Sequence, residues 1–263
     1  MKKYRALIFD IDWTLFDHKN HRFNPETIEA LKTIQKEHSE ILLFLCTSRP
    51  YGSFKELGTL DLGIDWDGYV ASSGALVYTD NQYLKKILVK HEDILNFINS
   101  AAKHDLCFEM IGLKDRILFG TPNPEYDEFY KIYSEVKAPH GTYRGQEVTG
   151  FTLFSNDKTD EAMKKENPNL IFSRFEKFSS DVISAPHEKG PALELLLNHY
   201  GIKKEEAMGF GDDLQDISLA KHVGTFVALG NAKPEVKAVA HYVSEPVYEK
   251  GLSTALRQFG LLD

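Results

Sequence analysis

Apolar residues in this chain gather in short runs that alternate with amphipathic stretches. In the N-terminal part, three continuous apolar runs predict strands that are buried on both faces, at residues 4–11, 40–48 and 69–74. Between the first two runs, residues 24–38 predict an amphipathic helix, with Asn24 as its N-cap and Pro25 in its first turn. Buried strands separated by helices indicate a parallel sheet covered by helices on both faces.

The same alternation returns in the C-terminal part of the chain. Strands are predicted at residues 206–213 and 224–231, and helices at 190–201, 214–223, 233–240 and 249–260. Because both ends of the chain carry this pattern, we expect them to build one α/β core around a doubly wound parallel sheet.

The middle of the chain has a different order of predicted helices and strands. A hairpin is predicted at residues 76–89, and helices and further strands in an α+β pattern follow it. The predicted helices are 91–104, 125–136 and 158–166, and the predicted strands are 106–112, 116–120, 147–155, 169–175 and 181–186. We therefore predict a core domain formed by residues 1–78 and 186–263. An α+β domain inserted at 79–185 would cover the carboxyl ends of the strands, where open parallel sheets bind ligands.

Composition narrows the classes of protein that fit. The chain has 263 residues, 42% of them hydrophobic and 27% charged, which is typical of a folded soluble protein of one large or two medium domains. The net charge of −8 disfavours binding to nucleic acid, which needs a basic face. No signal-peptide core or membrane-spanning run is visible, so we expect a cytoplasmic protein with no membrane partner. Cys46 and Cys107 are expected to be reduced core thiols, and the sequence makes no prediction of oligomeric state.

Acidic residues follow two of the predicted strands. The first apolar run ends in Asp10 and Asp12, whose side chains share a face because residues i and i+2 of an extended chain point the same way. Asp212 and Asp216 follow the strand at 206–213, and Asp213 between them is expected to be a loop acid. If the two strands are neighbours, these carboxylates converge, and oxygen ligands of that kind suit Mg²⁺.

Further polar residues stand where other elements meet. Thr47 and Ser48 stand at the end of the apolar run at 40–48, where hydroxyl and backbone N–H groups can bind phosphoryl oxygens. Lys189 precedes a helix and supplies a local cation. Acids, a metal, hydroxyls and a lysine together indicate a phosphoryl-transfer site, in which an aspartate can also serve as a covalent nucleophile.

Four motifs, in this order along the chain, resemble those of the haloacid dehalogenase superfamily. They are Asp10-x-Asp12-x-Thr14, Thr47, Lys189 and Gly211-Asp212-x-x-x-Asp216. The long insertion between the second and third motifs, together with "LGNAKPEVKAVAHYVSE" near the end, resembles the Cof-type phosphatases. The resemblance covers the whole chain, and the four motifs together are far more specific than any one of them.

The resemblance implies a role for each matching residue. Asp10 would be the nucleophile and Asp12 the general acid and base, while Thr47 and Lys189 would hold the phosphoryl group. Mg²⁺ would be bound by the Asp10 carboxylate, the Asp12 backbone carbonyl and Asp212, supported by Asp216. The inserted domain would act as a lid over a small phosphorylated substrate. The residues expected to contact the substrate are Ser48, Arg49 and Asn231, with Lys233 as a nearby basic residue.

Three positions depart from the usual family pattern. Gln215 stands where asparagine is common, Ser73 where the subgroup often has asparagine, and Trp13 at a position that is frequently glycine. None of these changes removes a catalytic group, so they bear on metal geometry and substrate preference.

The implied activity is a Mg²⁺-dependent phosphatase that forms an aspartyl-phosphate and acts on a sugar phosphate, a nucleotide or a phosphorylated cofactor. A phosphomutase uses the same nucleophile and remains an alternative. A regulator that binds a phosphoryl group without turnover is another, although such a protein has little use for Asp12.

Overall fold

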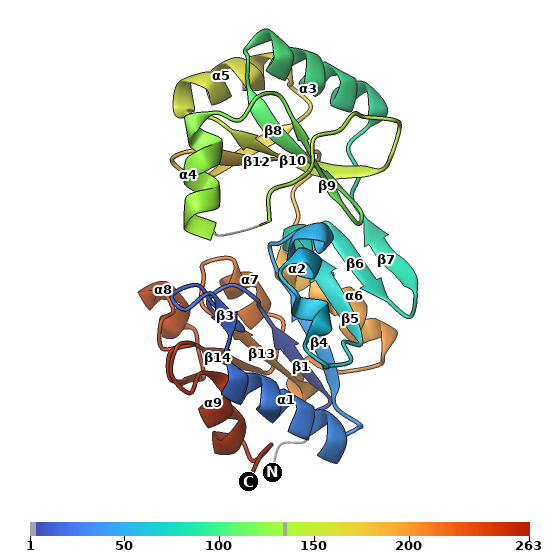
Figure 1. Cartoon of the computed structure of the whole chain (residues 1–263). Coiled ribbons are helices and arrows are strands. Elements are labelled where there is room, and N and C mark those ends of the chain that lie inside the picture. The colour runs from blue at the N-terminus through green and yellow to red at the C-terminus, as the bar shows by residue number, and fades with distance from the viewer. Residues whose placement is uncertain (1–3, 134–135) are drawn as a thin grey trace. The chain divides into compact units, whose positions relative to one another are not determined.

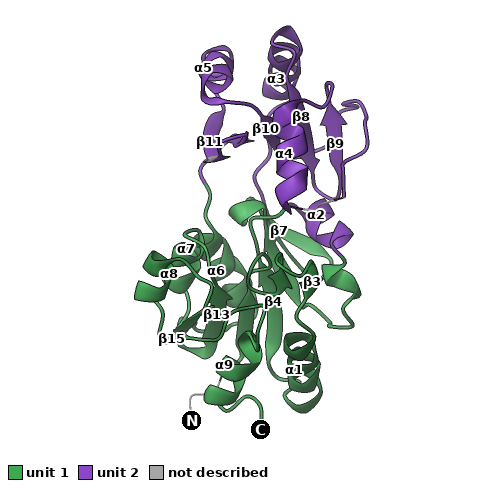
Figure 2. Cartoon of the chain, turned by 60° about the vertical axis from the view of Figure 1, so that its left-hand side comes forward, with its two compact units in different colours: residues 1–49, 58–85, 187–263 green, residues 50–57, 86–186 purple. Residues whose placement is uncertain are grey.

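The computed structural model describes residues 4–133 and 136–263, which divide into two compact units (Figures 1 and 2). The first unit consists of Met1–Arg49, Gly58–Lys85 and His187–Asp263, and the second of Pro50–Leu57 and Lys86–Pro186. Among the described residues, every helix is too short or too polar to cross a bilayer.

An eight-stranded sheet forms the centre of the first unit. Its order is β15 (Tyr242–Val243), β14 (Thr225–Ala228), β13 (Ala207–Gly211), β1 (Ala6–Phe9), β4 (Leu42–Cys46), β5 (Gly68–Ala71), β6 (Leu76–Thr79) and β7 (Gln82–Lys86). The central strand β1 is parallel to both neighbours, with Phe9 opposite Phe210 on β13 and Leu45 on β4. The carboxyl ends of β1, β4 and β13 therefore meet at one edge of the sheet (Figure 1).

Helices of the first unit bury their apolar sides against this sheet. They are α1 (Pro25–Glu37), α6 (Lys189–His199), α7 (Asp216–Ala220), α8 (Pro234–Ala238) and α9 (Leu252–Gln258). Residues of α6, α7 and α8 form one core cluster with β1, β4 and β5, whereas α1 packs against α9. The predicted N-cap of α1 is confirmed, because the Asn24 side chain accepts hydrogen bonds from the backbone N–H groups of Glu26 and Thr27.

The second unit has an antiparallel five-stranded sheet and helices on both faces. The strand order is β11 (Ile171–Glu176), β12 (Ser179–Ile183), β10 (Val148–Phe154), β8 (Cys107–Gly112) and β9 (Arg116–Phe119). The helices are α2 (Tyr51–Glu56), α3 (His91–Lys103), α4 (Pro124–Tyr133) and α5 (Asp157–Glu166). Along β10, Phe151 stacks on Phe97 of α3, and Phe154 packs in a second cluster with Phe129 of α4. Because successive side chains of a strand point to opposite faces of the sheet, Phe151 and Phe154 pack against helices on opposite faces.

The α/β fold and nearly all the predicted elements are confirmed. The hairpin at 76–89 differs from expectation, because β6 pairs antiparallel with β5 and so extends the first unit's sheet instead of opening the inserted domain. The second unit accordingly begins at Lys86, not at 79, and it also includes α2. The elements that were not predicted include α2, the short edge strand β15, and the small hairpin of β2 (Phe16–Asp17) and β3 (Arg22–Phe23). Residues 134 and 135, at the end of the helix predicted over 125–136, lie outside the described residues.

Candidate active site

The chain turns sharply where β1 ends. The backbone N–H of Asp10 still donates to the carbonyl of Phe210 on β13, at 3.1 Å. Beyond it, the carbonyl of Ile11 accepts from the N–H groups of Leu15 and Phe16, at 2.9 and 2.8 Å. This tight loop holds the backbone between Asp10 and Phe16 in a single conformation, and it carries the two acids of the first motif.

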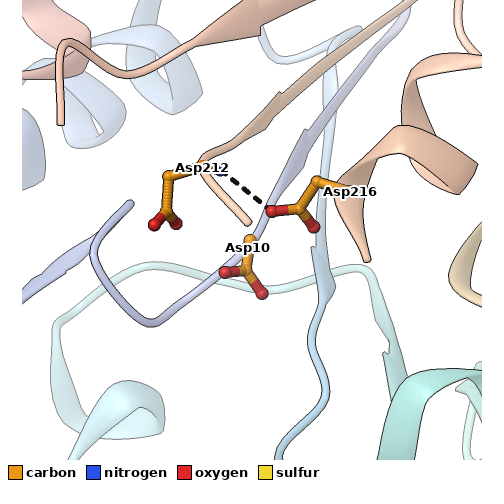
Figure 3. Close-up of side chains that lie close together, drawn as sticks. All are labelled: Asp10, Asp212 and Asp216. Atoms are coloured by element: carbon orange, nitrogen blue, oxygen red, sulfur yellow. Dashed lines mark hydrogen bonds between the residues drawn. The ribbon is translucent and has the colours of Figure 1, made fainter. Parts of the chain in front are cut away.

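Three carboxylates converge at this edge of the sheet (Figure 3). Asp10, Asp212 and Asp216 are buried, and each offers an oxygen within 4.8 Å of the others. The backbone N–H groups of Asp212 and Asp213 donate to Asp216 Oδ2 at 2.9 and 3.1 Å. Gly211 makes this approach possible, because a Cβ there would lie 2.5 Å from the Asp216 carboxyl carbon. The acids of two distant motifs therefore lie together, as their positions after neighbouring strands predict.

Lys189 is the buried cation of this cluster. Its Nζ donates to Asp10 Oδ1 and to Asp216 Oδ1, each at 2.7 Å. Burial acts to lower the pKa of Lys189, but these two carboxylates hold it well above its usual range. The ammonium group thus bonds two of the three carboxylates, and the cluster would carry an excess of negative charge if all three were ionised.

Asp10 and Asp212 accordingly hold their protons more strongly than free carboxyl groups do. Burial raises the pKa of Asp10 to about 8, with Lys189 opposing the rise and Asp216 adding to it. Burial and the carboxylates of Asp10 and Asp216 likewise hold the pKa of Asp212 well above its usual range. A divalent cation would compensate this charge, and a set of carboxylate oxygens matches the ligands of Mg²⁺. The residues present therefore fit such an ion.

Asp12 has different partners, although it lies only two residues from Asp10. Its carboxylate accepts hydrogen bonds from Arg49, at 2.8 Å from Nε and 2.7 Å from Nη2, and lies 2.6 Å from Nε2 of His18. Burial alone would raise the pKa of Asp12, but the Arg49 guanidinium and the His18 contact hold it well below its usual range. The Asp12 carboxylate is thus engaged outside the three-acid cluster, leaving its backbone carbonyl as the group to consider for a metal.

The loop after β4 is held by its own hydrogen bonds. Thr47 is fully buried, and its Oγ1 accepts from the backbone N–H of Arg49 at 3.1 Å. Its carbonyl accepts from the backbone N–H of Ser73 at 3.1 Å. Ser48 and Ser73 each donate a hydroxyl proton to Oε1 of Gln215, at 2.6 and 2.8 Å. Two of the departures from the family pattern, Ser73 and Gln215, are therefore in direct contact.

The remaining predicted residues make contacts with the protein itself. The Asn231 amide donates to the carbonyl of Trp13 at 2.8 Å and accepts from the backbone N–H of Val247 at 2.9 Å. It thereby fastens the loop that follows β1, and its contact with a substrate stays a prediction. Lys233 lies 2.7 Å from Asp213 in an exposed ion pair, which agrees with the expectation that Asp213 is a loop acid.

Two contacts at the site could not be read from the sequence. His18 reaches Asp12 only because the β2–β3 hairpin folds back, and a lone histidine in a polar stretch carries no signal of that. Thr14 belongs to the first motif, and its Oγ1 donates to Asp212 Oδ1 at 3.0 Å. The hydroxyl therefore links the first motif to the last.

Known proteins resemble this chain over nearly its whole length. A family model described as haloacid dehalogenase-like hydrolase matches residues 7–256. YkrA of Bacillus subtilis strain 168 is 26% identical over 272 residues, 98% of either chain. An HMP-PP phosphatase of Serratia proteamaculans is 26% identical over 256 residues, which span 90% of this chain and 87% of that protein. The solved structure of the sugar phosphatase BT4131 is 29% identical with a TM-score of 0.77, covering 98% of this chain and 100% of that one.

Proposed function

The chain belongs to the haloacid dehalogenase-like hydrolases, of the Cof type, and is therefore a phosphoric monoester hydrolase. We propose that it hydrolyses small phosphorylated metabolites with the help of Mg²⁺ and through an aspartyl-phosphate intermediate. The observation that carries this proposal is the buried cluster of Asp10, Lys189, Asp212 and Asp216 at the end of β1. Ionisation of all three acids needs positive charge beyond that of Lys189, and a divalent cation would supply it.

Asp10 is the nucleophile in this proposal. A carboxylate oxygen of Asp10 forms a bond to phosphorus while the bond from phosphorus to the leaving-group oxygen breaks. Lys189, 2.7 Å from Asp10 Oδ1, neutralises charge that gathers on the transferred phosphoryl group. Mg²⁺, held by the carboxylates of Asp10 and Asp212 and the backbone carbonyl of Asp12, would offset the charge of the phosphoryl oxygens.

Asp12 moves the protons. As general acid it gives a proton to the leaving alkoxide, and as general base it then takes one from the water that attacks the aspartyl-phosphate. The resting ion pair with Arg49 favours the ionised carboxylate, so Asp12 gains its proton only when Arg49 is drawn away. A substrate phosphate is the natural competitor for that guanidinium, because planar Arg binds phosphate oxygens in pairs. Binding and activation of the acid would therefore be linked.

The substrate class rests on the relatives. Their names include a phosphatase of HMP-PP and a sugar phosphatase, so we infer sugar phosphates, nucleotides or phosphorylated cofactors as candidates for this chain. In this proposal the second unit is the lid that selects the leaving group and excludes water.

Phosphate release tests the proposal. Wild type is incubated with an aryl phosphate and with a panel of sugar phosphates and nucleotides, each with Mg²⁺ and with EDTA. Release that needs the metal and falls by at least about a thousandfold in Asp10→Asn, while the loop-acid control Asp213→Asn retains it, supports the proposal. Transfer of the phosphoryl group to a second position of the substrate, without free phosphate, would point to the mutase. Absence of both reactions in folded protein would overturn the proposal.

A further inference from the structure

Trp13 combines a strained backbone with an exposed ring at the edge of the active site. Its φ is 56°, in the left-handed region where a bulky aromatic residue is a genuine outlier. The side chain is nevertheless 37% exposed, so burial of the indole does not repay the strain. Residues held in such conformations gather at functional sites, where neighbouring contacts fix them.

Those neighbouring contacts are on both sides of Trp13. Its N–H donates to the carbonyl of Phe16 at 2.9 Å, and its carbonyl accepts from the Asn231 amide at 2.8 Å. The indole lies against the His18 imidazole, with ring centroids 5.2 Å apart, and His18 in turn touches Asp12. The backbone of Trp13 is thus held through its own N–H and carbonyl, and the sequence places a large exposed ring directly after Asp12.

We propose that Trp13 is a specificity-determining residue, whose indole face binds a flat apolar face of the leaving group. This inference rests on the proposed function, in which Asp12 protonates the leaving-group oxygen. The indole lies against His18, which contacts the Asp12 carboxylate, so in this proposal the leaving group that Asp12 protonates meets the indole. An exposed indole offers a planar, electron-rich surface to an aromatic ring or to the C–H face of a sugar ring. The shared chemistry is a ring attached near the phosphate-bearing carbon.

A comparison of three esters tests the inference. Benzyl phosphate carries an aromatic ring, glucose 6-phosphate a sugar ring, and glycerol 3-phosphate no ring, and all three release a primary alcohol. The kcat/KM of each is measured for wild type, Trp13→Phe, Trp13→Leu and the control Trp66→Phe, which removes the other of the chain's two tryptophans. We expect Trp13→Leu to lower kcat/KM about tenfold more for at least one of the two ring esters than for glycerol 3-phosphate. Trp13→Phe, which keeps an aromatic ring, should show a smaller loss of kcat/KM for the same ester. Which ester is affected identifies the ring.

The outcomes separate this inference from the proposed function. If Trp13→Leu keeps the wild-type ratios among the three esters, whether all rates fall together or none does, Trp13 only supports the His18 packing and the inference is overturned. Release of inorganic phosphate from glycerol 3-phosphate would still uphold the phosphatase in that case. If wild type hydrolyses none of the three esters, nor any of the wider panel, the proposed function fails and this inference fails with it.

Fluorescence gives a readout that does not depend on turnover. The Trp66→Phe protein has Trp13 as its single tryptophan. Titration with benzyl alcohol plus orthovanadate should shift or quench its emission in a saturable manner, whereas glycerol plus orthovanadate should not. The same titration of Trp13→Phe, which reports Trp66, should give no saturable change. An unchanged Trp13 emission under conditions in which benzyl phosphate is hydrolysed would contradict the stacking contact.

Discussion

Lys189 shows how one side chain serves both stability and chemistry. It is 2% exposed and bonded to two carboxylates of a cluster that would otherwise hold only negative charge. Breaking a buried ion pair by removing one partner leaves the other uncompensated, which is costly. The charge that stabilises the resting protein is therefore also available to the transferred phosphoryl group.

Replacing Lys189 by methionine should expose this double role. We expect Lys189→Met to lose about 3–5 kcal/mol of unfolding free energy and nearly all phosphatase activity. Because the remaining carboxylates would gain from a cation, Mg²⁺ should raise the stability of the variant more than that of wild type. Urea denaturation with and without Mg²⁺ measures this. The exposed control Lys233→Met should change stability by less than about 0.5 kcal/mol, and an equally small loss in Lys189→Met would refute the prediction.

Asp181 on β12 of the second unit carries a pH dependence of its own. Burial raises its pKa to about 7. The folded protein therefore holds a proton that the unfolded chain releases near the usual value of 3.8, so stability is full below that value and falls as the pH rises toward 7. Asp181→Asn removes the titration. We expect it to be more stable than wild type by about 2 kcal/mol at pH 8 and by little at pH 4.

Thermal or urea unfolding across this pH range checks the sign. Asp127→Asn, at an exposed acid of the same unit, serves as the control and should follow the wild-type profile. A parallel shift of Asp181→Asn at every pH would contradict the assignment of the raised pKa.

At the scale of elements, the active site is a set of loops tied to one another. Gln215, at the start of α7, accepts from Ser48 after β4 and from Ser73 after β5. The backbone φ values of Ser72 and Ser73, 48° and 53°, are unusual for serine, so that loop is costly to hold in this shape. The side-chain bonds to Gln215 thus help to keep the loops after β4 and β5 in position.

Loss of the hydrogen bonds to Gln215 should weaken substrate binding more than it slows the chemical step. Gln215→Ala removes two hydrogen bonds but no catalytic group, so we expect KM to rise about 3- to 10-fold and kcat to change less. Ser73→Ala should give a smaller rise in KM, because one of the two bonds remains. Steady-state kinetics, with inhibition by inorganic phosphate as a second measure of binding, tests this. A fall in kcat at constant KM would instead assign Gln215 to the chemical step.

Helix α2 follows the same loop but belongs to the second unit. Glu56 at its end lies 2.5 Å from Arg116 of β9, which also bonds Glu109 of β8 at 3.1 Å and the carbonyl of Val136 at 2.8 Å. A Cβ at Gly52 would lie 3.2 Å from the backbone of Asp115, so α2 packs closely there. Helix α2, which follows Thr47 along the chain, is thus bound to residues of its own unit.

Glu56→Gln should loosen this helix without unfolding the protein. We expect faster hydrogen exchange at residues 50–57 by about tenfold, since a charged hydrogen bond to a buried arginine is replaced by a weaker one. The neighbouring control Lys55→Ala should leave exchange unchanged. If exchange in Glu56→Gln matches wild type, packing at Gly52 alone holds α2.

At the scale of the whole molecule, local patterns and distant contacts differ in how well they can be predicted. The strands β1, β4 and β13 are buried on both faces, and their apolar runs reveal them, as do the acids that follow β1 and β13. The contact of Ser73 with Gln215 spans 142 positions, and that of Glu56 with Arg116 spans 60. Such contacts depend on the folded arrangement of several elements, so the local hydrophobic periodicity of the sequence does not predict them. The partner of Asp12 and the place of α2 were hidden for that reason.

The measurement that tests the central claim most directly is the trapping of the phosphoryl group on Asp10. Wild type and Asp12→Asn are mixed with a labelled phosphate ester and Mg²⁺, quenched in acid, digested and analysed by mass spectrometry. We expect one phosphoryl group on the peptide that contains Asp10, in larger amount in Asp12→Asn, because that variant lacks the base that activates water. Phosphate release by wild type with no phosphorylated Asp10 in either protein would mean that water attacks the substrate directly, and the account of this site would be wrong.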